Sequence, residues 1–356
     1  MFKTSSKLRL LALVIVLFVP AVALAQDPRA SLASLPDADV LIYVSPRKIL
    51  NDAAPKIMPA TEVTKMRASF GDMKKGIGID PSSIEYLVIA VRFHKPAGDL
   101  SFVAPDVMAV AGGDFNSDSL VSLAQLSLQD KVRMATHGSK TIALMKIDEF
   151  AGDALKNPML KSFSEVGAVA LTPNSIAIGN LPYLKSAIEA ADGTGRINPA
   201  TLESLMRDPN VLLAATGAPV ASFAKAFGLF GTETTPRDSR CDTPFGNFYT
   251  AITISGTNFS LRGAMNADNA DTAQIISGLL LGLMQQGINA VPDKEAQAIL
   301  QAIKMTPRQN EIVWEADIPE QVVADIFKPK PSMQEPPQTS PAPKKKKPVV
   351  RRKRNR

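Results

Sequence analysis

The chain has 356 residues, of which 45% are hydrophobic and 21% are charged, a composition typical of globular proteins. Its single cysteine, Cys241, excludes an internal disulfide and a multi-cysteine zinc site. The formal net charge of +6 is divided unevenly, because residues 1–25 carry +3 and residues 328–356 carry +10, which leaves −7 for the body between them.

The first 25 residues are typical of a secretory signal peptide. Lys3, Lys7 and Arg9 precede an apolar run over Leu10–Val19, and Ala23-Leu24-Ala25 forms a small-residue cleavage site. We therefore expect cleavage after Ala25 and a periplasmic or secreted protein. No later segment is apolar for long enough to span a bilayer, so no transmembrane segment is expected after cleavage.

The first part of the body alternates short strands with helices. Hydrophobic periodicity, Gly/Pro/Asn turns and capping residues set the boundaries. The predicted strands are Val40–Val44, Tyr86–Phe93, Asp106–Phe115, Val132–Thr136, Thr141–Ile147, Val166–Leu171 and Ser175–Gly179. The predicted helices are Glu62–Lys75, Asp118–Leu128, Pro182–Ala191 and Thr201–Arg207.

The second part of the body repeats this pattern. Residues 208–213 echo residues 37–42, and strands at Asn247–Ser255 and Phe259–Ala264 precede a long helix at Asp271–Gly287. Matched blocks in the same order predict an internal duplication. Gly278 and Gly282, one turn apart on that helix, predict tight packing onto the sheet.

The predicted fold class is therefore α+β, with two related modules of mixed or antiparallel sheet and packed helices. The predicted divisions are a signal peptide at 1–25, a first module at 26–195, a second module at 196–327 and a disordered tail at 328–356.

The tail at 328–356 is rich in proline and in positive charge, and it holds almost no apolar residue. Such a segment cannot bury enough surface to offset its ordering entropy. Lysine and arginine clusters attract polyanions, and outside the cytoplasm these are anionic lipids or cell-wall polymers. The tail has no aromatic residue to stack on bases, which disfavours nucleic acid as its partner. The predicted anionic-surface residues are Lys344, Lys345, Lys346, Lys347, Arg351, Arg352, Lys353, Arg354 and Arg356.

Two Ser-x-x-Lys sequences are the only motifs that suggest covalent chemistry. Ser45 precedes Lys48, and Ser222 precedes Lys225, in the spacing used by exported penicillin-recognising enzymes. The accompanying Lys-Thr-Gly and Ser-Asp-Asn elements are absent from the sequence. Ser45 also precedes Pro46 in the arrangement of a helix cap, which explains it structurally.

No metal or cofactor site is predicted. His94 and His137 fall in different predicted elements with no partner pattern, and they are interpreted as surface histidines rather than catalytic residues or metal ligands. The Asn/Asp-rich turns at Asp114–Asp118 and Asn266–Asp271 lack the glycine and distal glutamate of an EF-hand, so helix capping is the favoured interpretation. Gly112-Gly113-Asp114-Phe115 is similar to a cyclic-dinucleotide synthase signature but lacks its glutamate.

Several short segments resemble exported bacterial proteins of unknown function built from repeated α/β modules. The resemblance rests on Leu35-Pro36-Asp37-Ala38-Asp39, Tyr43-Val44, Asn51-Asp52-Ala53-Ala54-Pro55 and Ile178-Gly179-Asn180. It implies export and repeated modules, and it implies no active site.

The leading functional hypothesis is an exported, non-enzymatic binding or envelope-associated protein, whose tail contacts anionic envelope material and whose body is free for a protein partner. One alternative is an exported hydrolase or acyl-transfer enzyme that uses Ser45 or Ser222. Another is a scaffold that joins envelope components.

Overall fold

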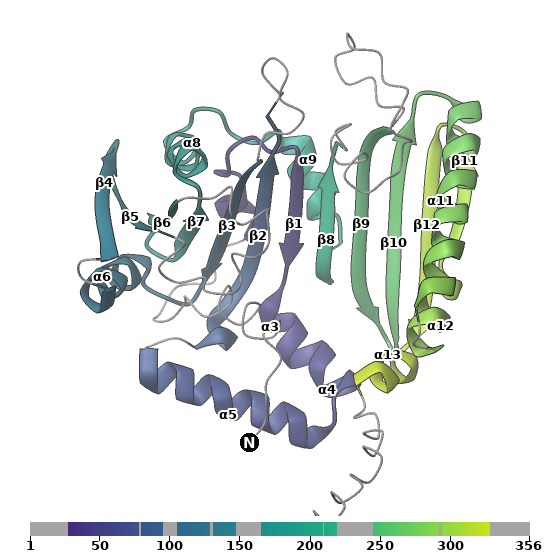
Figure 1. Cartoon of the computed structure of the whole chain (residues 1–356), viewed down its shortest axis with the longest axis horizontal. Helices are drawn as coiled ribbons and strands as arrows, with labels where there is room; N and C mark the ends of the chain where they lie inside the picture. The colour runs from purple at the N-terminus through teal and green to yellow at the C-terminus, as the bar shows by residue number, and fades with distance from the viewer. Residues whose placement is uncertain are drawn as a thin grey trace, which may run out of the picture.

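The computed structural model describes residues 28–77, 80–94, 105–128, 131–146, 165–208, 210–218, 245–291 and 294–327. Within these ranges one twelve-stranded sheet crosses the molecule, and helices pack on both of its faces (Figure 1). The predicted α+β class is confirmed. All of the described strand pairs are antiparallel. The predicted signal peptide and the predicted tail lie outside the described residues.

The strands run from one end of the sheet to the other in the order β11-β12-β10-β9-β8-β1-β2-β3-β7-β6-β5-β4. Their bounds are β1 Val40–Val44, β2 Ile84–Arg92, β3 Asp106–Gly113, β4 Val132–His137, β5 Lys140–Lys146, β6 Glu165–Thr172, β7 Ser175–Gly179, β8 Val211–Gly217, β9 Phe245–Ser255, β10 Asn258–Ala267, β11 Lys304–Arg308 and β12 Glu311–Pro319.

The two halves of the sheet share one order of strands. In the first half β1, β2 and β3 are adjacent, and β7 and β6 follow; in the second half β8, β9 and β10 are adjacent, and β12 and β11 follow. The hairpin β4–β5 extends the first half alone. At the centre β1 pairs with β8, for example Ile42 with Ala215, which joins the two predicted modules in one sheet.

Most of the helices are short, and α3, η1 and α4 follow one another without a break. Their bounds are α2 Pro28–Leu32, α3 Pro46–Lys48, the π-helical η1 Ile49–Ala53, α4 Ala54–Ile57, α5 Ala60–Ile77, the 3₁₀-helical η2 Pro81–Ser83, α6 Ser117–Leu128, α8 Leu181–Ala191, α9 Pro199–Leu205, α11 Ala270–Ala290, α12 Lys294–Ala302 and α13 Glu320–Phe327. None of these described helices has the length and apolar character of a membrane span.

The largest core lies where α2, α8 and α9 cover one face of the sheet. Alternate residues of β2 point into it, including Tyr86, Val88 and Ala90, because successive side chains of a strand point to opposite faces. Helix α8 contributes the fully buried Tyr183 and Leu184. This packing holds the start of α8 against the end of β2 and the start of β3, where the candidate site is found.

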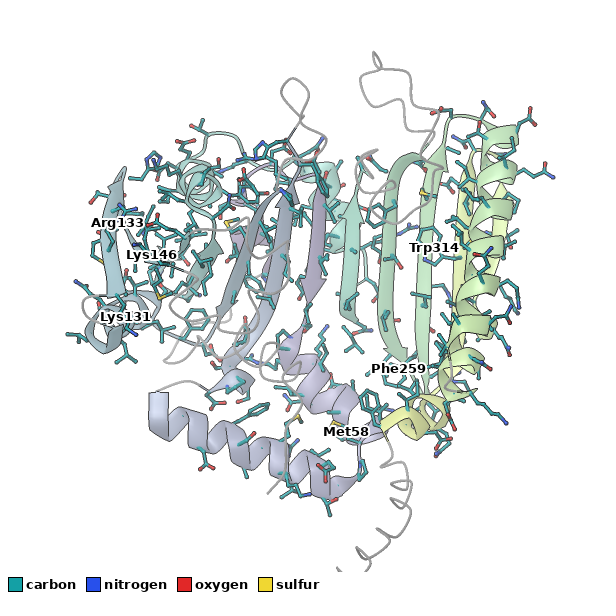
Figure 2. All side chains as sticks on the ribbon, viewed as in Figure 1. Met58, Lys131, Arg133, Lys146, Phe259 and Trp314 are labelled. Atoms are coloured by element: carbon teal, nitrogen blue, oxygen red, sulfur yellow. The ribbon has the colours of Figure 1, made fainter. Side chains whose placement is uncertain are left out.

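Three smaller cores lie under the remaining helices. Helix α6 packs through Leu120 and Val121 beside Ile176, and α4 and α13 close over Phe259. Helix α11 packs through Ile276 onto Ile312 and Trp314, as Figure 2 shows for Trp314 on β12 beside that helix. A helix follows each of the strands β3, β7, β10 and β12, and each packs apolar side chains toward the sheet, those of α13 being only partly buried.

The prediction that Gly278 and Gly282 pack onto the sheet is wrong. A Cβ atom at either glycine would meet nothing within 4 Å, because both residues are exposed on the outer side of α11. The sheet-facing side of α11 carries Ala273 and Ile276 instead. The spacing of the two glycines could not reveal which side of α11 faces the sheet, because the rotation of a helix about its axis is set by its larger apolar side chains.

Candidate functional site

A polar cluster surrounds Asp106, where β3 begins beside the end of β2. The register places Asp106 opposite Arg92, and His94 follows two residues later. Asn180 occupies the N-cap position of α8 without a side-chain capping bond, and its amide reaches the same carboxyl. We name Arg92, His94, Asp106, Asn180 and Ser186 the Asp106 cluster.

The Asp106 carboxylate is buried, with 6% of its side chain exposed, and it is well supplied with donors. Arg92 Nη2 lies 2.7 Å and Arg92 Nε 3.3 Å from Oδ2, and His94 Nε2 lies 2.8 Å from the same oxygen. The amide of Asn180 donates to Oδ1, and its own Oδ1 accepts from the backbone N–H of Val107 at 3.0 Å. The cluster thus links β2, β3 and α8.

Electrostatics favour the charged form of Asp106. Burial opposes ionisation, but hydrogen bonds from Arg92 and Asn180 and the nearby charges of His94 and Arg92 outweigh it, so the pKa of Asp106 is lowered from its usual value. A carboxylate with several strong donors is a fixed negative charge at neutral pH. It therefore holds the guanidinium and the imidazole in place.

The neighbouring Tyr183 forms the floor of the cluster. The guanidinium carbon of Arg92 lies 4.6 Å from the centre of its ring, a cation–π geometry, and the Tyr183 hydroxyl donates to the carbonyl of Asp37 at 3.0 Å. Burial raises the pKa of Tyr183 strongly, although the charge of Arg92 opposes this. Tyr183 is therefore a neutral structural donor.

The arrangement orients His94 and leaves part of it accessible, since 41% of its side chain is exposed. A carboxylate behind an imidazole is the geometry that fixes a histidine in one orientation for binding or proton transfer. The cluster also contains the hydroxyl of Ser186, which lies 3.3 Å from Arg92 Nη1 and 3.4 Å from the carbonyl of Pro182. These contacts therefore supply an oriented imidazole, that of His94, beside the guanidinium of Arg92, which Asp106 holds in place.

A second cluster lies at the opposite ends of β2 and β3, around Arg47. Its Nη1 lies 2.7 Å from Glu85 Oε1, and its Nη2 lies 2.7 Å from Asp114 Oδ2. Nη2 also lies 3.5 Å from the carbonyl of Ser83. Arg47 therefore ties α3 to β2 and to the turn before α6, which is a structural role.

The structure places Ser45 directly before α3, with Pro46 as the first helical residue, as predicted. Its hydroxyl makes no capping bond. It lies 3.5 Å from the carbonyl of Glu85, and the residue is only 2% exposed. A buried hydroxyl of this kind gives no support to the acyl-transfer alternative. Ser222 and Lys225 lie outside the described residues.

Both histidines are at least partly exposed, and each has an acidic neighbour that the sequence analysis did not identify. His94 pairs with Asp106, and His137 Nε2 lies 2.9 Å from Glu189 Oε1 on α8. Sequence reasoning missed Arg92 and Asp106 as well. A signal was present, because an antiparallel connection from β2 to β3 brings the end of one strand beside the start of the next.

The helix-capping interpretation of the Asn/Asp turns is confirmed. The side chain of Asn116 accepts from the N–H of Ser119 at 2.9 Å, and Asn269 accepts from the N–H of Thr272 at 2.8 Å. Among the described residues, no group of three or more His, Cys, Asp or Glu is placed to hold a metal ion. The nine predicted anionic-surface residues at 344–356 lie beyond the described chain.

The lowered pKa of Asp106 predicts a loss of stability in acid. A carboxyl whose pKa is lower in the folded state stabilises the fold above its unfolded pKa, and this contribution is lost as the pH falls through the folded pKa. Between about pH 5 and pH 2 we expect the unfolding free energy of the wild type to fall more steeply than that of Asp106→Asn. Urea titrations at each pH measure this difference, and parallel curves would contradict the assignment.

The chain matches no protein-family model, and it matches no curated protein. Among solved structures it is similar to crystal form I of TP0453, with a TM-score of 0.42 and 12% sequence identity, over 85% of this chain and 97% of that one. Crystal form IV of TP0453 gives a TM-score of 0.39 and 10% identity, over 83% and 95% of the two chains. At this distance the likeness carries no argument about function.

Proposed function

We propose that this protein is an exported, non-enzymatic binding protein of the cell envelope, whose tail at 328–356 contacts anionic envelope material. The observation that carries the proposal is the separation of charge: +10 in the tail against −7 in the body. The body then remains free for a protein partner. Anionic lipids and acidic cell-wall polymers both present a dense array of phosphate or carboxylate groups, and this is the chemistry that the tail would recognise.

The described end of the chain is compatible with a tethering role. Helix α13 ends at Phe327, which is 51% exposed, so the described chain ends at the surface of the body. Electrostatic attraction of a lysine or arginine near an anionic membrane contributes about 1 kcal/mol per residue and falls off within a Debye length. Nine such residues over 344–356 are sufficient for anchoring without a fixed tail conformation.

We also infer that the body arose by internal duplication. The matched sequence blocks and the shared order of strands in the two halves support this inference. The hairpin β4–β5 is then an addition to the first half.

The test of the tail uses the full mature chain and a variant in which all nine basic residues at 344–356 are glutamine. Binding to phosphatidylglycerol vesicles, phosphatidylcholine vesicles and purified cell wall is measured by co-sedimentation. We expect the wild type to bind anionic material at low salt, and the variant to lose at least about tenfold in affinity. The two anionic surfaces distinguish a lipid target from a cell-wall target.

A second variant keeps the composition of the tail and scrambles its order. It should bind like the wild type, because counterion release depends on the number of charges rather than on their sequence. Equal binding by the glutamine variant would overturn the anchoring role and direct attention to the Asp106 cluster.

A further inference from the structure

The sheet has two outer strands, and they differ in how they resist pairing with another strand. Figure 1 shows β11 at one end and β4 at the other. Outer strands present unpaired backbone groups, and natural proteins protect them with proline and charged residues. Strand β11 carries Lys304, Pro307 and Arg308 within five residues. Strand β4 contains no proline.

The register identifies which backbone groups point outward. In a hairpin closed by a two-residue turn, the pair beside the turn exchanges both hydrogen bonds, and bonded pairs then alternate with unbonded pairs. His137 and Lys140 flank such a turn, so Val132, Met134 and Thr136 direct their N–H and C=O groups away from β5. Within the described part of the chain, β5 is the only strand that pairs with β4.

The same reasoning shows that β11 is blocked at its outward positions. Arg308 and Glu311 flank the turn between β11 and β12, so Met305 and Pro307 are the outward residues. Pro307 has no N–H to donate, which removes one of these two donors. In β4 all three outward residues, Val132, Met134 and Thr136, keep an N–H group that can donate.

The charges on β4 do not oppose a second strand. Arg133 lies 2.9 Å from Glu165 Oε2, and His137 lies 2.9 Å from Glu189 Oε1, so both basic groups already have acidic partners. Figure 2 shows Arg133 on this outer strand. The remaining residues of β4 are uncharged.

An apolar surface adjoins the open edge. Helix α6 packs on β5 and β6 over the core that Val132 and Met134 also contact. Its outer side leaves Leu126 72% exposed and Leu123 42% exposed. These leucines lie one turn apart on a helix that packs on β5, the strand that pairs with β4, so they add apolar surface near the outer edge of β4.

We propose that β4 pairs antiparallel with β4 of a second copy of this chain about a two-fold axis, with the outer sides of the two α6 helices flanking the joint. A pairing centred on Met134 places Met134 opposite its own copy and Val132 opposite Thr136 of the second copy. Every outward N–H and C=O of these three residues then has a partner. Arg133 lies opposite Ala135, so the two arginines do not face each other.

A second copy fits this edge better than a head-to-tail arrangement. Pairing of β4 with β11 of another copy would build an open filament, and Pro307 with the flanking Lys304 and Arg308 blocks it. The two-fold arrangement closes after two copies. A six-residue strand pair alone falls short of the roughly 1,200 Å² of a stable interface, so α6 must contribute and the affinity should be on the order of micromolar.

The test measures mass by light scattering during gel filtration of the full mature chain, from about 1 to 200 µM. We expect the mass to rise toward twice that of the monomer, equally at low and high salt, because backbone pairing is not a charge effect. Salt-sensitive association would instead report contact between the basic tail and the acidic body, and it would count against this proposal.

Matched variants separate the two edges. Thr136→Lys places a charge on the β4 edge, and Leu126→Glu places one on α6. Each variant should either stay monomeric at about 200 µM or have a dissociation constant roughly tenfold higher than that of the wild type. Met305→Lys, at the outward position of β11 that keeps its N–H, should leave association unchanged. Thermal unfolding checks that each variant is folded.

Hydrogen exchange locates the contact independently. The amides of Val132, Met134 and Thr136 should become protected as concentration rises, while the amide of Met305 should not. A monomer at all concentrations, or a dimer that Thr136→Lys leaves intact, overturns the proposal. Protection of these amides only in the presence of another protein would assign the edge to that partner instead.

Discussion

Replacing Asp106 with alanine is expected to lower the free energy of unfolding by about 2–4 kcal/mol. The substitution leaves the Asn180 amide and the Arg92 guanidinium without their acceptor, close to the buried ring of Tyr183. A buried donor that loses its partner costs far more than an exposed one, because water cannot replace the lost bond. The cost is moderated by partial exposure of Arg92 and His94.

Glu189→Ala is the matched control for this prediction. It also removes a carboxylate from a histidine, but the side chain of Glu189 is 53% exposed, and exposed ion pairs contribute at most about 1 kcal/mol. Denaturant titrations at pH 7 should separate the two variants clearly. Equal losses would mean that the Asp106 cluster is not the link between β2, β3 and α8.

Gly113→Ala is expected to destabilise the protein by about 2–4 kcal/mol. A Cβ atom at this position would overlap with the backbone oxygen of Ser83, and Glu85 N lies only 2.9 Å away. The Ser83 carbonyl cannot move freely, because it accepts from the N–H of Asp114 at 3.0 Å. Overlap with a held backbone atom is relieved only by separating β3 from η2.

Gly278→Ala on α11 is the control, because its Cβ would meet nothing within 4 Å. Alanine there should stabilise the helix by up to about 1 kcal/mol. The two glycine variants therefore have opposite expected signs in the same unfolding assay. A neutral Gly113→Ala would show that β3 does not approach Ser83 this closely.

The close approach at Gly113 also explains the Gly112-Gly113 sequence in structural terms. At Gly112 a Cβ would overlap with the ring of Tyr86, its partner across the β2–β3 pair. Both glycines are required by packing, and Phe115, the last residue of the motif, is buried in the core with α6. The similarity to a nucleotide-cyclising signature therefore has a packing origin.

Local periodicity was sufficient to predict most of the elements. The strands at Val40–Val44 and Ser175–Gly179 have the predicted bounds, and the helix before Leu128 begins one residue earlier than predicted. These elements were predictable because hydrophobic alternation, turn residues and capping residues lie within a few positions of the structure that they specify.

The capping residues were predictable for the same reason. Asn116 and Asn269 bond to N–H groups only three residues away, so sequence proximity nearly determines the contact. The arrangement of strands within each half was also suggested by the repeated order of blocks. What such local signals do not contain is the partner of a surface side chain or the rotation of a helix.

Only the tertiary structure decided the pairing of β1 with β8, the contact of Asp106 with Asn180, and the place of β4 at one end of the described sheet. Asp106 and Asn180 are 74 positions apart, and their meeting depends on β7 returning beside β3. The sequence by itself determined the α+β elements, the charge separation and the helix caps. A long-range contact is set by the packing of the whole chain. The sequence offers many side chains of the same chemistry as possible partners, and only the pairing of the strands determines which of them lie close together.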